Sequence, residues 1–99
     1  MGLSKVLVAA LAAVYTGKTT VTTAGTRVVL ASAQAVTSVT VKATAANTGI
    51  IYVGNSTVAA ANGFPLAASE SVSLDITDLS TVWIDSSANS QSAAYIGIG

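Results

Sequence analysis

Two stretches decide the fold, SVTVKAT at residues 38–44 and SVSLDIT at residues 71–77. In the first stretch, Val39, Val41 and Ala43 alternate with hydroxyl and lysine side chains. In the second, aliphatic residues alternate in the same way with serine, aspartate and threonine. Successive side chains of a strand point to opposite faces of a sheet. This period of two therefore predicts two half-buried β-strands.

The two stretches are also similar to each other at an offset of 33 residues. They share Ser, Val, a hydroxyl residue, an aliphatic residue and the final Thr. Each is followed by a segment with a central aromatic residue, Ile51-Tyr52-Val53 after the first and Val82-Trp83-Ile84 after the second. One interpretation is a strand–turn–strand unit that occurs twice, as two related hairpins facing each other in a sandwich. The alternative is chance similarity in a sequence built mainly from Ala, Val, Ser and Thr.

Short strands separated by turns are also expected in the rest of the chain. We predict a hairpin over residues 19–30 around Ala24-Gly25, and strands over 50–53, 81–85 and 94–98. Asn47-Thr48-Gly49 and Asn62-Gly63 are turn signals, the second because both of its residues tolerate positive φ. About seven to eight short strands predict an all-β chain, a single domain over residues 1–99. The expected architecture is a small antiparallel β-sandwich or a flattened barrel.

The N-terminal residues 1–15 carry one early lysine and then an apolar run of ten residues from Val6 to Tyr15. One interpretation is a secretory signal peptide. The other is an integral strand or short helix that docks on a partner. The run is far shorter than the ~20 residues of a membrane-spanning helix, so no membrane partner is expected. We expect the strand or short helix and treat residues 1–15 as a candidate attachment segment.

The charge content of the 99-residue chain is low, at 8% with zero net charge. Soluble domains usually carry about 25% charged residues, and net charge near zero promotes association. The four basic residues are spread along the chain and form no patch for a phosphate backbone. We therefore expect no nucleic-acid partner. The composition favours a protein that associates through a surface of hydroxyl and methyl groups.

The sequence lacks the residue types on which most catalytic sites depend. It contains no His, and so lacks the usual proton shuttle, and no Cys, and so lacks thiol nucleophiles and thiolate metal sites. The acids Glu70, Asp75, Asp78 and Asp85 are a poor match to a Ca²⁺ loop. We expect them to be solvated or to cap turns, with Asp78 bonding the backbone two residues on. The prediction is no enzyme activity, no cofactor and no metal.

Large apolar and aromatic side chains are the candidates for contact with a protein partner. Trp83 is out of phase with Val82 and Ile84, so it faces the other side of its sheet. It belongs either to a second packed layer or to an interface, where Trp and Tyr are favoured. The candidate partner contacts are Leu3, Val6, Val8, Leu11, Tyr15 and Trp83.

The chain from Val39 to Gly99 resembles small virion proteins of tailed bacteriophages. The segments that carry the resemblance are Asn47–Gly49 leading into Ile51–Gly54, then Gly63–Leu66, Glu70–Val72, Asp78–Ser80 and Tyr95–Gly97. These are turns and strands, and none is a catalytic motif. The resemblance implies a β-sandwich capsid decoration (cement) protein, or a head- or tail-fibre module.

A decoration protein of this kind lies on the capsid exterior and bridges subunits of the major capsid protein. The resemblance therefore implies the major capsid protein as partner, and a homo-oligomer, dimer or trimer, as the associating form. We expect residues from Gly2 to Tyr15 to supply part of the contact as an added strand. The alternative function is a fibre- or tail-associated carbohydrate-binding β-sandwich module. Such a module would expose several aromatic side chains on one face, and the chain has five in total.

Overall fold

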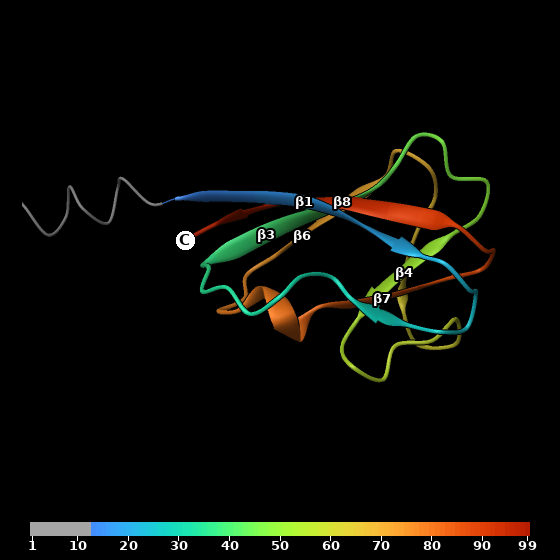
Figure 1. Ribbon diagram of the computed structural model, residues 1–99, viewed down its shortest axis with the longest axis horizontal. Helices are drawn as coiled ribbons and strands as arrows, with labels where there is room; N and C mark the ends of the chain where they lie inside the picture. The colour runs from blue at the N-terminus through green and yellow to red at the C-terminus, as the bar shows by residue number, and fades with distance from the viewer. Residues whose placement is uncertain (1–12) are drawn as a thin grey trace, which may run out of the picture.

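The computed structural model describes residues 13–99, which form eight strands and one short 3₁₀ helix (Figure 1). In chain order they are β1 (Val14–Val21), β2 (Val28–Val29), β3 (Ser38–Ala43), β4 (Ile51–Gly54), β5 (Phe64–Leu66), β6 (Ser71–Leu74), η1 (Leu79–Thr81), β7 (Trp83–Ser86) and β8 (Gln91–Ile98). The predicted all-β class with seven to eight short strands is confirmed.

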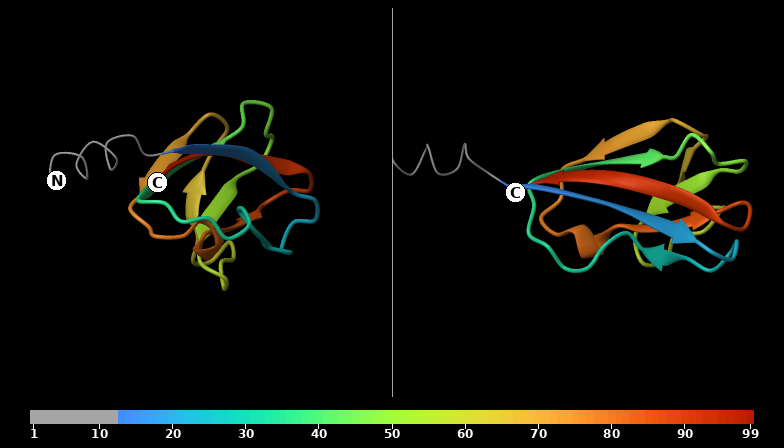
Figure 2. Two further views of the ribbon diagram at one scale, coloured as in Figure 1. Left: turned by 60° about the vertical axis from the view of Figure 1, so that its left-hand side comes forward. Right: turned by 45° about the horizontal axis from the view of Figure 1, so that its top comes forward.

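The strands form two separate four-stranded sheets, packed face to face (Figure 2). In sheet A the order is β1-β8-β3-β6, and in sheet B it is β2-β7-β4-β5. Every neighbouring pair is antiparallel. The fold is therefore the small antiparallel β-sandwich that the sequence predicted, and not the flattened barrel.

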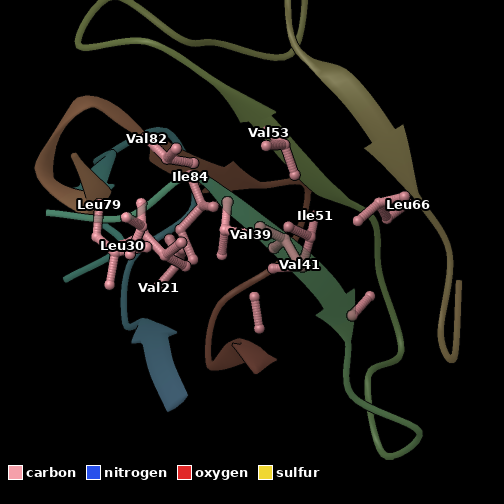
Figure 3. Close-up of a cluster of buried hydrophobic side chains, with 13 residues drawn as sticks. Val21, Leu30, Val39, Val41, Ile51, Val53, Leu66, Leu79, Val82 and Ile84 are labelled. Atoms are coloured by element: carbon pink, nitrogen blue, oxygen red, sulfur yellow. The ribbon is translucent and has the colours of Figure 1, made fainter. Parts of the chain in front are cut away.

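The inner faces of the two sheets enclose one hydrophobic core (Figure 3). In β3 the predicted alternation is confirmed, since Val39, Val41 and Ala43 are at most 1% exposed while Lys42 is exposed. The core residues are Val21, Leu30, Val36, Val39, Val41, Ala43, Ile51, Val53, Leu66, Leu79, Val82, Ile84 and Ala93. Full burial of one Val, Leu or Ile side chain contributes about 1.5–3 kcal/mol, so this cluster is the main source of stability.

The predicted hairpin over residues 19–30 is wrong, because its two strands belong to different sheets. β1 pairs with β8 in sheet A, whereas β2 pairs with β7 in sheet B. The turn between them is fixed by the far end of the chain: Gly25 N donates to Asp85 Oδ1 (2.9 Å), and Ala24 N donates to Asn89 Oδ1 (2.9 Å). These contacts hold the turn in which the chain passes from sheet A to sheet B. Gly25 has a φ of +85°, which favours glycine.

The two similar stretches, at residues 38–44 and 71–77, lie side by side in sheet A. The pairs between them are Val39–Leu74, Thr40–Ser73, Val41–Val72 and Lys42–Ser71. The offset of 33 residues relates each residue of β3 to a counterpart in or directly after β6. When every residue is exchanged for its counterpart, the same register results; for example, Val39–Leu74 becomes Val72–Val41. β3 and β6 are therefore related by an approximate two-fold axis through Thr40 and Ser73, whose hydroxyls are hydrogen-bonded at 2.8 Å.

The strands that follow, β4 and β7, are also neighbours and lie in sheet B. Their pairs are Ile51–Ser86, Tyr52–Asp85, Val53–Ile84 and Gly54–Trp83. If Tyr52 and Trp83 are taken as counterparts, exchanging counterparts again gives the same register, and Val53–Ile84 is the pair at its centre. Each repeated unit is therefore an arch that crosses from sheet A to sheet B. The expectation of two hairpins is corrected, and the sequence similarity coincides with a two-fold arrangement in space.

Several element boundaries also differ from the prediction. β7 begins at Trp83 because residues 79–81 form η1, and β8 begins at Gln91, three residues before the predicted strand over 94–98. The turn at Asn62-Gly63 is present, but neither residue has positive φ. A Cβ on Gly63 would lie 2.5 Å from the Cβ of Tyr52. Glycine is required there by close packing rather than by backbone conformation.

Candidate functional site

The predicted partner contacts fall into three groups. Leu3, Val6, Val8 and Leu11 lie outside the described residues. Tyr15 lies in β1, half-buried and packed against the core, and does not point outward. Trp83 is half-buried and alternates with the buried Val82 and Ile84, so it lies on the outer face of sheet B as the sequence phase predicted.

The outer face of sheet A is built from the longer strands of the molecule, and among residues 13–99 its side chains are exposed or half-buried. It consists of Val14, Thr16, Lys18 and Thr20 of β1, Ser92, Ala94, Ile96 and Ile98 of β8, Ser38, Thr40 and Lys42 of β3, and Ser71 and Ser73 of β6. Three aliphatic side chains are exposed on it: Val14 by 60%, Ile96 by 46% and Ile98 by 45%. Val14 lies directly opposite Ile98, so these residues form one apolar patch near the end where β1 begins.

Four of the seven hydroxyl groups on this face bond to one another in pairs. The hydroxyls of Thr20 and Ser92 are hydrogen-bonded at 2.7 Å across β1 and β8. The hydroxyls of Thr40 and Ser73 form the equivalent bond across β3 and β6. Covering a polar group that already has a partner costs less than covering an unpaired one. The face can therefore be covered by a partner at a modest desolvation cost.

A groove of about 560 Å³ runs beside β1, between that strand and residues 30–34. The Thr19 hydroxyl donates to the carbonyl oxygen of Leu30 at 2.7 Å and joins the two walls. Inside it, the ring of Tyr95 lies against Gly17, where an added Cβ would be 2.5 Å from the Tyr95 hydroxyl oxygen. Gly17 thus allows the aromatic ring to cross beneath the edge strand.

A second hollow, of about 370 Å³, lies next to Trp83 on the outer face of sheet B. Its other lining residues are Gly25, Thr26, Arg27 and Ser56. The Arg27 Nε donates to the carbonyl oxygen of Ser56 at 2.5 Å, and Arg27 and Trp83 both line the hollow. The site therefore combines an aromatic surface with hydrogen-bond donors.

Three of the four carboxylates hold the backbone in place. Asp78 caps η1: its Oδ1 accepts from Ser80 N (2.8 Å), the Ser80 hydroxyl (2.8 Å) and Gln34 N (3.2 Å). These bonds, with that from Ser80 N first, hold the pKa of the Asp78 carboxyl below its ordinary value of 3.8. Glu70 accepts from Ala67 N, and the buried Asp85 accepts from Gly25 N. The predicted turn-capping role, including the bond of Asp78 two residues on, is confirmed.

The sequence interpretation missed the polar side chains that lock the loops at the start of β8. The Gln91 side chain is 5% exposed, and its Oε1 accepts from both Thr48 N and Gly49 N at 2.8 Å. Asn47 Nδ2 donates to the carbonyl oxygen of Ser92 at 2.8 Å. These contacts join residues more than forty positions apart. The local sequence around Gln91 does not predict them.

No protein-family model matches the chain, and no curated protein matches it significantly. Over residues 13–99, the structure contains no helix of the length and apolarity needed to cross a membrane. The same residues bring together no group of three or more His, Cys, Asp or Glu side chains suited to a metal ion. The candidate sites described above are the outer face of sheet A, the groove beside β1 and the hollow at Trp83.

Proposed function

We propose that this chain is a structural protein of a tailed-bacteriophage virion, a decoration (cement) protein on the exterior of the head. In this proposal it binds the major capsid protein, bridges neighbouring subunits, and self-associates as a dimer or trimer. It needs no cofactor and performs no reaction. The resemblance of residues 39–99 to small virion proteins supports the family, and the outer face of sheet A supplies the docking surface.

The observation that carries the proposal is the apolar patch of Val14, Ile96 and Ile98 on that face. Exposed aliphatic groups on a sheet face gain free energy when a partner covers them. Among residues 13–99, the strands of this face carry the charges of Lys18 and Lys42, and the exposed Asp75 follows β6 in the phase of Ser71 and Ser73. These groups must remain solvated or find partners. A modest contact of this kind, repeated over a symmetric shell, gives strong total binding.

The test measures binding of the purified chain to capsids by co-sedimentation. Ile96→Glu places a charge in the centre of the patch, and we expect at least a tenfold weaker binding, as for a buried anchor of an interface. Ala60→Glu is the matched control, because Ala60 is an exposed residue in the loop between β4 and β5. Equal binding of both variants would show that this face is not the docking surface.

The N-terminal contribution needs a separate deletion. Val14 and Tyr15 belong to β1, so a deletion reaching residue 15 would damage the sheet. Removal of residues 2–12 leaves β1 in place. If these residues supply part of the contact, the truncated chain binds capsids more weakly while its stability is retained. Unchanged binding would restrict the contact to the sandwich.

The carbohydrate-binding alternative rests on a different surface, the hollow of Trp83 and Arg27. An aromatic face with adjacent donors suits a sugar ring, whose C–H groups stack while its hydroxyls accept hydrogen bonds. A glycan array with the wild-type chain and Trp83→Ala distinguishes the two functions. Glycan binding lost in Trp83→Ala, together with no affinity for capsids, would favour the alternative.

A further inference from the structure

The free edge of β6 is the place where the approximate two-fold arrangement of the arches is incomplete. In sheet B both central strands have an outer neighbour, β2 beside β7 and β5 beside β4. In sheet A, β3 has β8 as its outer neighbour, but β6 is the last strand among the described residues. No backbone hydrogen bond within residues 13–99 reaches that outer side of β6.

Because β6 has no outer neighbour among residues 13–99, apolar side chains of this strand and next to it are partly exposed. Val72, Leu74 and Ile76 are half-buried, whereas their counterparts in the first arch are at most 1% exposed. On the same side of the sandwich, Phe64 is 55% exposed. Phe64 lines a hollow of about 480 Å³ together with residues 69–71, at the start of β6. An added strand at this edge would cover apolar side chains as well as pair the backbone.

β1, at the opposite side of sheet A, is the other edge strand, and no backbone hydrogen bond among residues 13–99 reaches its outer side. It runs for eight residues without proline, and its ladder with β8 is continuous from Val14 to Val21. A long, regular edge strand readily pairs with another chain. Because sheet A has four antiparallel strands, β1 and β6 run in opposite directions. Two copies in the same orientation therefore present edges that match as an antiparallel pair.

The charges at the two edges are opposite. Glu70 and Asp75, both exposed, flank β6, while β1 carries the exposed Lys18. Pairing β6 with β6 of a second copy would bring acidic groups together, and pairing β1 with β1 would bring two Lys18 side chains close. Two registers close to the centre of β1 align the core faces, one with Lys18 opposite Ser71 and the other with Lys18 opposite Ser73. The second register also places Lys18 diagonal to Asp75, and it is the one that the charges favour. Diagonal partners of this length are within reach of each other.

We propose that copies of this chain associate head to tail, with the free edge of β6 in one copy pairing antiparallel with the free edge of β1 in the next. This inference deepens the proposed self-association and rests on it, but it does not depend on binding to capsids. A head-to-tail contact closes into a ring or continues as a filament. Of the two proposed oligomers, a trimer can form through this contact as a closed ring, whereas a dimer of like edges does not use it.

The first test uses the absence of native cysteine in the sequence. Copies with Lys18→Cys are mixed with larger, tagged copies with Asp75→Cys and treated with a short bismaleimide. We expect the mixed 18–75 product to dominate over the 18–18 and 75–75 products. Lys42→Cys copies replace the Lys18→Cys copies in the control. Lys42 shares the outer face but lies two strands inside the β1 edge, so we expect little product. Dominance of a like–like product would overturn the head-to-tail contact.

The second test measures the oligomer mass by light scattering across a dilution series. We expect Lys18→Glu and Asp75→Lys each to weaken association about fivefold, the range for reversal of an exposed charge pair. The double variant should return to wild-type association, because the opposite charges are restored in exchanged positions. A wild-type chain that stays monomeric at all concentrations overturns the proposal. Binding of that monomer to capsids would leave the decoration function standing, so the two failures are distinguishable.

Discussion

The two arches, β3–β4 and β6–β7, have similar sequences but different surroundings. Val39 and Val72 occupy corresponding positions in them, yet Val39 is 1% exposed and Val72 is half-buried. β3 lies between β8 and β6, whereas β6 has β3 as its one neighbour in the described part of sheet A. The burial of a strand is therefore set by its neighbours, and the same local pattern gives a central strand in one arch and an edge strand in the other.

The connections of the two arches are also held by different polar groups. In the first, the Asn47 amide is bonded to the backbone of Ser92 through both its oxygen (2.9 Å) and its nitrogen (2.8 Å). In the second, the Asp78 carboxylate accepts from Ser80 N and Gln34 N. An amide does not titrate, whereas a carboxylate loses acceptor strength when it is protonated. The second connection is therefore the acid-sensitive one.

The largest expected difference between the arches concerns their matched valines. Val39→Ala removes two carbons from a fully buried site, and we expect it to lower the free energy of unfolding by about 2–3 kcal/mol. Val72→Ala makes the same change at a half-buried site and should cost about 1 kcal/mol. Urea denaturation of the dilute protein measures both values. Equal costs would show that the β6 edge is covered more fully than the single chain indicates.

Repeating these denaturation measurements at several protein concentrations tests whether the β6 edge is covered by a second copy. If the β6 edge pairs with another copy, Val72 becomes buried in the oligomer, and the cost of Val72→Ala should rise toward that of Val39→Ala as the concentration increases. The cost of Val39→Ala should increase little, because that site is already buried in one chain.

A smaller difference is expected at low pH. The folded-state pKa of Asp78 lies below its ordinary value of 3.8, so its contribution to stability is present above that pH. The contribution is lost as the pH falls from about 3.8 through the folded-state pKa. Asp78→Asn keeps an acceptor oxygen but cannot titrate. Comparing the unfolding of the two proteins between pH 5 and 2 should show a gap that closes in acid. A gap independent of pH would contradict the assigned role of the carboxylate.

The strands were predictable from the sequence because period two is a local property, as in β3. The sheet that each strand joins was not, since it depends on distant bonds such as Gly25 N to Asp85 Oδ1. The exposed aliphatic patch was missed for a related reason. Gly97 is buried and faces the core so closely that a Cβ there would lie only 3.2 Å from Val36 Cγ1. Its neighbours Ile96 and Ile98 therefore face outward. The sequence Tyr-Ile-Gly-Ile-Gly gives no sign of this inverted pattern.

The smallest expected effect is at the two-fold axis itself, where the hydroxyls of Thr40 and Ser73 meet at 2.8 Å. A double-mutant cycle with Thr40→Val and Ser73→Ala should give a coupling of about 0.5 kcal/mol, typical of a cross-strand hydroxyl pair. Thr20 and Ser92 form the matched pair outside the arches, at 2.7 Å, and should give a similar value. Coupling at both pairs would show that hydroxyl contacts hold neighbouring strands throughout sheet A. Zero coupling at Thr40–Ser73 alone would mean that the backbone ladder, and not this bond, holds the two arches in register.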